Sequence, residues 1–233
     1  MTTVAIHQPN YLPWLGYFGK IAEADILVFL DDVQFSKNSY TNRTRVLDAG
    51  KARWLTVPVS VHLGDPINRV RPARPDWPAR HLDTLFNFYR GAPAFRAVWP
   101  RVEELYGALP RADIAASNRF LIENIAQELG LACRFAKSSE VEVKGTSGDD
   151  RLVALTAAVA PGGCYLSGRG GADYQNPDKF AAAGLKFRYV DFTHPVYDQG
   201  GQEFTPGLSV MDAVFRLGWA AAAELLEQSG RRP

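Results

Sequence analysis

The run Ile26–Leu30 limits the possible folds more than any other feature, because five apolar residues follow one another without a polar interruption. A strand of this kind is buried on both faces and is typical of a parallel sheet that helices cover on both sides. A shorter apolar run, Val4–Ile6, precedes it, and Leu15, Phe18 and Ile21 recur at helical spacing between the two. The beginning of the chain therefore predicts a strand, a helix and a second parallel strand.

The same alternation returns in the second half of the chain. We expect strands at Ala132–Ala136, Cys164–Leu166 and Leu185–Val190, with helices at Gly148–Ala160 and Pro177–Ala183 between them. This order indicates a doubly wound, Rossmann-like α/β fold with a mainly parallel sheet.

The middle of the chain follows a different pattern. Turn residues between Val46-Leu47 and Trp54–Val57 predict an inserted hairpin, and a proline-rich loop runs from Arg71 to Pro78. A helical layer or small helical subdomain is expected at approximately residues 77–130, with helices at His81–Tyr89, Pro100–Leu109 and Asp113–Leu129. Near the end, Ser209 with Asp212 forms a capping-box pattern at the start of a last helix.

The length of 233 residues allows a single hydrophobic core, so we expect one domain over residues 1–228 and a disordered tail at residues 229–233. The first residues lack the pattern of a signal peptide, and no apolar stretch is long enough for a membrane span. A cytoplasmic protein is therefore predicted, in which Cys133 and Cys164 are buried free thiols. The spacing of the histidines and cysteines suggests neither a metal site nor a cofactor.

Basic residues outnumber acidic ones by nine to three between residues 37 and 80, although the whole chain carries a net charge of only +1. The basic residues are Lys37, Arg43, Arg45, Lys51, Arg53, Arg69, Arg71, Arg74 and Arg80. Two interpretations are open. The region is either a solvated surface with charges balanced in space, or it binds an anion such as a diphosphate or a nucleic-acid backbone.

Polar loops follow four of the predicted strands and begin near His7, Asp31, Ser167 and Asp191. Because the carboxyl ends of parallel strands share one edge of a sheet, where open α/β sheets bind their ligands, these loops are expected to converge on one site. Each loop also has a purely structural explanation, such as a packed histidine, a capping carboxylate or a tight turn without a ligand.

The chemistry of these loops suggests roles for individual residues. His7 and His194 are candidate bases because histidine exchanges a proton near neutral pH, and the choice between them stays open. Asp31 is a third candidate catalytic residue, because it directly follows a strand and so lies at the same sheet edge as His7. For substrate binding, the loops and the residues after them offer Lys37, Asn42, Arg43, Gly168, Arg169, Gly170 and Tyr197.

A long motif at the start, together with shorter ones later, resembles the WbqC-like family over nearly the whole chain. The motifs are His7 to Trp14, Leu30 to Phe35, Leu55 to Pro58, Tyr165 to Gly168, His194-Pro195 and Leu208-Ser209. One departure is Phe215-Arg216, where an asparagine often follows the phenylalanine. The resemblance implies site roles for Asn10, Tyr11, Gln34 and Ser167, in addition to His7, Asp31 and His194.

The resemblance further implies a bacterial cytoplasmic protein of surface-polysaccharide or O-antigen gene clusters. It suggests glycyl (aminoacyl) transfer to the amine of a nucleotide-linked amino sugar, so the expected partner is a nucleotide-linked sugar or another phosphorylated small molecule, and aminoacyl-tRNA is a possible donor. Two alternatives are a nucleotidyltransferase and a noncatalytic sugar-nucleotide binding protein. A weaker similarity to HIGH-type nucleotidyltransferases would place their histidine pair near Trp14 and at Tyr17, where this chain has aromatic residues instead.

Overall fold

A computed structural model describes residues 1–143, 147–171, 175–201 and 203–230. Its centre is a five-stranded sheet in the order β7-β2-β1-β8-β9, in which every neighbouring pair is parallel. The strands are β1 (Thr3–His7), β2 (Ile26–Phe29), β7 (Arg134–Lys137), β8 (Cys164–Ser167) and β9 (Lys186–Tyr189). The predicted α/β fold with a mainly parallel sheet is therefore confirmed.

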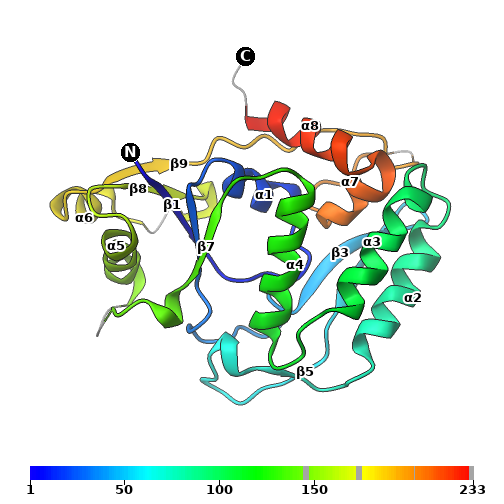
Figure 1. The fold of residues 1–233 in the computed structure, drawn as a ribbon, viewed down its shortest axis with the longest axis horizontal. Helices are drawn as coiled ribbons and strands as arrows, with labels where there is room; N and C mark the ends of the chain where they lie inside the picture. Colours follow the sequence, from blue (N-terminus) through cyan, green and yellow to red (C-terminus); the bar gives the residue numbers. More distant parts are fainter. Residues whose placement is uncertain (144–146, 172–174, 202, 231–233) are drawn as a thin grey trace.

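Helices cover both faces of this sheet, as Figure 1 shows. The helices α1 (Leu15–Ala22) and α4 (Ile114–Glu128) lie on one face, and α5 (Gly148–Val159) and α6 (Pro177–Ala182) lie on the other. Alternate strand residues serve the two layers: Ala5 belongs to the cluster of α1 and α4, whereas Val4 belongs to that of α5 and α6. This double burial explains the uninterrupted apolar strands of the sequence.

The order of the strands reverses at β1. The chain passes from β1 to β2 and β7 on one side, and then crosses to β8 and β9 on the other. Such a switch point opens a crevice outside the carboxyl ends of the two central strands, here β1 and β8. The crevice lies directly after His7 and Ser167, the last residues of those strands.

The predicted hairpin is present as β3 (Arg43–Asp48) paired with β4 (Lys51–Thr56). Its two-residue turn has positive φ at both Ala49 (45°) and Gly50 (79°), the backbone that matches the twist of the two strands. A second, short antiparallel pair is formed by β5 (Val59–Ser60) and β6 (Arg71–Pro72), with a 3-10 turn at Ile67–Arg69 between them.

Three boundaries in the middle of the chain differ from the sequence prediction. The segment Arg71 to Pro78 is not a continuous loop, because β6 begins it and α2 (Trp77–Tyr89) starts within it, with Pro78 in the first turn where its missing N–H is tolerated. The helix α3 (Phe95–Gly107) begins five residues before Pro100, which lies inside it. The predicted strand at Ala132–Ala136 starts only at Arg134.

The last helices are α7 (Val210–Leu217) and α8 (Trp219–Gly230). Ser209 caps α7 by accepting a hydrogen bond from the Met211 N–H, but Asp212 does not complete a capping box and turns into the core. Since α8 continues to Gly230, Ser229 and Gly230 are helical and do not form the start of a disordered tail; residues 231–233 lie outside the described residues.

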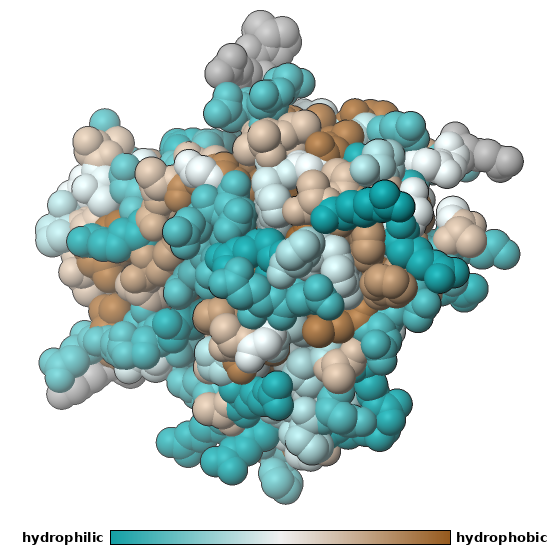
Figure 2. Space-filling view, turned by 45° about the vertical axis from the view of Figure 1, so that its right-hand side comes forward, coloured by the Kyte–Doolittle hydropathy of each residue, from teal (hydrophilic) through white to brown (hydrophobic). Residues whose placement is uncertain are grey.

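The helices α2, α3, α4 and α7 share one hydrophobic core with α1 and one face of the sheet, which favours a single domain. On the face of the molecule that Figure 2 shows, hydrophilic side chains lie between the hydrophobic patches. Among the helices of the described ranges, none is both long enough and apolar enough to cross a membrane. Both cysteines are free.

Candidate functional site

A pocket of about 470 Å³ occupies the switch point between β1 and β8. Its walls come from the ends of these strands, from α1, and from the segments after β8 and β9. It is lined by Ile6, His7, Trp14, Gly16, Tyr17, Lys20, Tyr165, Ser167, Gly168, Arg169, Gly170, Gln175, Val190 and Phe192. The pocket thus brings together five residues singled out from the sequence, namely His7, Ser167, Gly168, Arg169 and Gly170.

His7 ends β1, and its ring lies edge-on to Tyr17 at a centroid distance of 4.7 Å. Its Nδ1 is 3.1 Å from the Gln8 carbonyl oxygen. Because a carbonyl can only accept, Nδ1 carries the proton and Nε2 is left as an acceptor. Burial, reinforced by the charge of Lys20, lowers the pKa of His7 from 6.5 to about 3. His7 is therefore a neutral hydrogen-bond acceptor at the pocket wall.

Lys20 is a charged residue of this pocket that the sequence prediction missed. It is buried, with 6% of its surface exposed, and its Nζ donates to the Ile6 carbonyl oxygen at 3.0 Å. Burial lowers its pKa from 10.5 to about 8. Burial is the only cause of this shift, and within the described ranges no carboxylate offsets it, so a buried cation faces the pocket with unused donors. The available signal was that Lys20 is the only charged residue of α1, three and four residues after Tyr17 and Gly16.

The loop after β8 forms the opposite wall. Ser167 is buried, and its hydroxyl contacts the Gly168 carbonyl and the side-chain oxygen of Gln175. A Cβ added to Gly168 or Gly170 would meet no atom within 4 Å, so these glycines leave open space beside the backbone. Arg169 is exposed and donates to Asp191 at 2.9 Å. The loop can therefore approach a ligand closely and adds a cation at the rim.

The turn between β1 and α1 is held by side chains from distant elements. Asn118 of α4 donates to the Pro9 carbonyl at 2.8 Å, and Thr44 of β3 donates to the Leu12 carbonyl at 2.9 Å. Leu12 adopts φ of 39°, a left-handed backbone that a leucine rarely takes. The contacts that fix this turn explain much of the long motif, and they also fix the position of Trp14 at the pocket wall.

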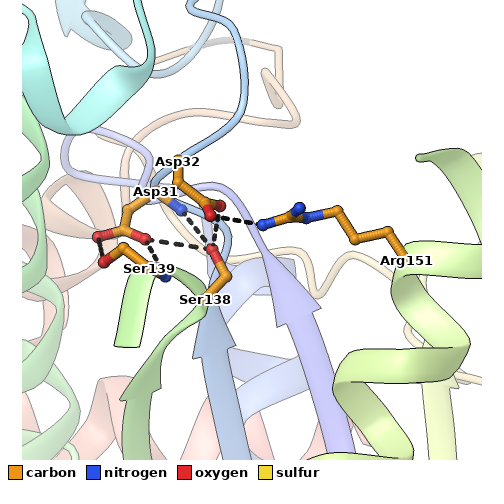
Figure 3. Close-up of polar contacts among 5 residues, drawn as sticks. All are labelled: Asp31, Asp32, Ser138, Ser139 and Arg151. Carbon is orange, nitrogen blue, oxygen red and sulfur yellow. Dashed lines mark hydrogen bonds and ion pairs between the residues drawn. The ribbon is translucent and has the colours of Figure 1, made fainter. Parts of the chain in front are cut away.

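Asp31 does not line this pocket. It accepts from the Ser139 N–H at 3.0 Å and the Ser139 hydroxyl at 2.8 Å, and lies 3.1 Å from Ser138 Oγ (Figure 3). The same Oγ is 2.5 Å from Asp32, which forms an ion pair with Arg151 of α5. This cluster joins the ends of β2 and β7. Asp31 borders a separate depression of about 360 Å³, so the structure does not bring it beside His7.

Tyr11 and Tyr197 also have structural partners, which leaves them outside the pocket lining. The Tyr11 hydroxyl is buried between His81 Nδ1, at 2.7 Å, and the Tyr106 hydroxyl. The Tyr197 hydroxyl donates to Asp212 at 2.8 Å. Asn10 is buried and likewise does not line the pocket.

His194 is the second candidate base, and both of its ring nitrogens are in contact with backbone. Its Nε2 accepts from the Gly207 N–H at 3.0 Å, and its Nδ1 is 3.3 Å from the Pro195 carbonyl. Burial lowers its pKa. His194 does not line the pocket, and it touches the pocket-lining ring of Phe192 only from behind, at a centroid distance of 5.8 Å.

The remaining predicted residues lie in the basic region or just before it. Gln34 is exposed and bridges to Pro66, while Lys37 and Asn42 line a surface depression of about 570 Å³. The Arg43 guanidinium stacks over the Trp54 ring at 4.0 Å. None of the four lines the switch-point pocket.

Asp212 was noted in the sequence only as a helix cap, yet it is fully buried. The Tyr89 hydroxyl donates to it at 3.0 Å and accepts from the Leu47 N–H at 2.9 Å. With the bond from Tyr197, this carboxylate connects α7 to α2 and to the segment before α7, while burial raises its pKa. In the described part of the chain, no three histidine, cysteine or acidic side chains are grouped as a metal site would require.

Comparison with known proteins places this architecture in a family. Residues 8–224 match the WbqC-like protein family. The chain belongs to the WbqC-like family. It is 29% identical over 221 residues to the uncharacterized protein Rv1507c of Mycobacterium tuberculosis, a match that covers 94% of this chain and 95% of that protein. No solved structure is significantly similar to it.

Proposed function

We propose that this WbqC-like protein transfers an acyl group, in the simplest case glycyl, to the amine of a nucleotide-linked amino sugar. Family membership links the chain to polysaccharide gene clusters. The observation that carries the proposal is the switch-point pocket, which combines the buried cation Lys20 with the neutral acceptor His7. An anionic substrate would pair its negative charge with Lys20, and its nucleophilic amine could donate a hydrogen bond to His7.

The phosphates of the sugar nucleotide are assigned to the cationic side of the pocket. Lys20 has donors left after its bond to the Ile6 carbonyl, and the Gly168 to Gly170 loop leaves space for close backbone approach. Arg169 is exposed at the rim, where it can exchange its contact with Asp191 for a phosphate oxygen. A ligand phosphate would then neutralise a buried charge that the described residues leave unpaired.

His7 is assigned the role of the base that accepts the proton of the amine. Nitrogen attacks the acyl carbonyl carbon, the new N–C bond forms, and the bond from that carbon to the donor oxygen or sulfur breaks. The proton lost by the amine passes through His7 Nε2 to the leaving group. A pKa of about 3 is too low for this role; burial is the larger cause of the lowering, and a phosphate that neutralises Lys20 would remove the smaller one. Substrate binding would thus make His7 a stronger base.

A thermal-shift screen tests the binding step. At a hundred times its dissociation constant a ligand adds about 2.7 kcal/mol, which corresponds to roughly 5–10 °C for a protein of this size. We expect stabilisation by nucleotide-linked amino sugars and a reduced shift in Lys20→Met. Stabilisation by ATP or CTP with magnesium alone would instead favour a nucleotidyltransferase.

Turnover is tested by mass spectrometry of the sugar nucleotide after incubation with glycyl donors. The expected product gains one glycyl residue, and His7→Asn is expected to bind the sugar nucleotide but form little product. If the sugar nucleotide bound but no acyl donor gave a product, the protein would be a noncatalytic sugar-nucleotide binding protein.

A further inference from the structure

A strip of aromatic rings leads out of the pocket onto the hairpin. Trp14 lines the pocket, the Tyr40 ring lies 5.4 Å from it, and the Trp54 ring lies 5.7 Å from Tyr40. The Arg43 guanidinium covers the Trp54 ring at 4.0 Å. We call these four residues the aromatic strip. It is a continuous surface that joins the catalytic candidates to the basic region.

The outer half of the strip is exposed and lies outside the hydrophobic core. Trp54 is 47% exposed and Tyr40 is 39% exposed, and neither belongs to the hydrophobic core clusters. Phe86, another exposed ring of the described residues, packs on Phe95 and Trp99 instead. Tyr40 and Trp54 do not line the pocket themselves, but Tyr40 contacts the pocket-lining ring of Trp14, so the two exposed rings form an apolar surface beside the pocket that suits a ligand.

The hairpin positions two members of the strip, Trp54 and Arg43. Trp54 is paired with Arg45 across the two strands and lies on the same face as Arg43; Trp54 is exposed, and the two arginines are partly buried. The opposite face is anchored by Val46 and Leu55, which are buried. Regular strand pairing therefore fixes this part of the strip, so a ligand would bind to side chains that are already in position.

The basic residues beside the strip indicate which kind of ligand it binds. The face of the hairpin that carries Trp54 also carries the two arginines Arg43 and Arg45, whereas Lys51, Arg53 and the single acid Asp48 lie on the opposite face, where Arg53 pairs with Asp48. Exposed rings interleaved with cations bind single-stranded nucleic acids, because every base has a face that stacks and every nucleotide has a phosphate. A sugar nucleotide has one base and would use one ring, whereas successive rings and an arginine suit a short strand.

We infer that the aromatic strip binds the single-stranded 3′ end of an RNA that carries the acyl donor as an ester, as aminoacyl-tRNA does. This inference rests on the proposed acyl transfer and identifies its donor. The strand would stack on Trp54 and Tyr40 and deliver its terminal ester past Trp14 toward His7. The amide N–C bond forms, the ester C–O bond breaks, and the proton of the amine ends on the ribose hydroxyl.

Fluorescence anisotropy with a labelled single-stranded RNA that ends in CCA tests the inference. Trp54→Ala and Tyr40→Ala are each expected to weaken binding about five- to 150-fold, and Trp54→Phe is expected to retain most of it. Phe86→Ala is the matched control, since it removes a 40% exposed ring from α2, away from the strip, and should bind as the wild type does. Arg43→Ala should lower the salt dependence by about 0.7 in the slope of log K against log salt.

Thermal unfolding of each variant separates loss of the surface from loss of the fold. RNA binding that is absent in the wild type, or equal in the wild type and a folded Trp54→Ala, overturns the inference. The proposed function has its own readout, stabilisation by a nucleotide-linked amino sugar, so it can stand when the RNA does not bind. If Trp54→Ala weakened the sugar nucleotide and not the RNA, the strip would belong to the acceptor and the inference would fail.

Discussion

The charge of Lys20 lowers the pKa of His7, and both side chains lie in the pocket at the switch point of the sheet. Lys20→Met should therefore raise the pKa of His7 from about 3, which an NMR titration of the ring protons measures directly. The same change removes donors to a phosphate and should weaken nucleotide-sugar binding by about ten- to a hundredfold. Lys186→Met, which removes an exposed lysine of β9, is the control and should leave both values unchanged. An unmoved His7 pKa would contradict the coupling.

The stability of the protein should fall in acid partly because of His7. Its pKa is about 3 when folded and 6.5 as the unfolded reference, so between these values the unfolded chain binds a proton that the folded chain does not. The free energy of unfolding therefore decreases as the pH falls from 6.5 toward 3, by at most about 1.4 kcal/mol per pH unit for this group. His7→Asn should flatten this part of the curve. Urea unfolding at a series of pH values measures the slopes, and parallel curves for the two proteins would exclude the contribution.

The sheet and its covering helices were predictable because their signals are local. Apolar runs such as Ile26–Leu30 and helical spacing in α1 each reflect burial on a known face. The start of α3 could not be predicted in this way. Pro100 has the character of a first-turn proline, yet the helix begins five residues before it. Boundaries of this kind depend on packing: α3 begins where Ala94 donates its N–H to Phe215 of α7.

The candidate site was predictable only in part. His7 and Ser167 end the two central strands, so their convergence follows from topology. The sequence could not show that Tyr11 is engaged by His81, or Tyr197 by Asp212, because these partners come from separate elements. Lys20 was missed because a single lysine on an apolar helix usually extends to the solvent.

Ser138→Ala tests the cluster at the ends of β2 and β7. The Ser138 hydroxyl lies within hydrogen-bond distance of both Asp31 and Asp32 and also accepts from the Asp31 N–H at 3.2 Å. Its removal leaves two adjacent carboxylates without the donor between them and should cost about 1–3 kcal/mol of unfolding free energy in urea. Ser36→Ala, at an exposed position, should have little effect. Equal unfolding midpoints for the two variants would show that the cluster adds nothing to stability.

Tyr11→Phe distinguishes a structural from a substrate-binding role for the tyrosine of the long motif. The hydroxyl lies between His81 Nδ1 and the Tyr106 hydroxyl in a fully buried position. His81 Nε2 donates to the Thr56 carbonyl at 3.1 Å, so Nδ1 must accept, and loss of the tyrosine hydroxyl leaves it unpaired.

We therefore expect Tyr11→Phe to lose about 1–3 kcal/mol of stability in urea while its affinity for nucleotide-linked amino sugars stays unchanged. Tyr40→Phe is the matched control, because the same atom is removed from a 39% exposed side chain and the ring is kept. If Tyr11→Phe instead bound nucleotide-linked amino sugars ten times more weakly at unaltered stability, Tyr11 would have a role in substrate binding. The expected result instead assigns this tyrosine to the support of the turn that carries Trp14 to the pocket.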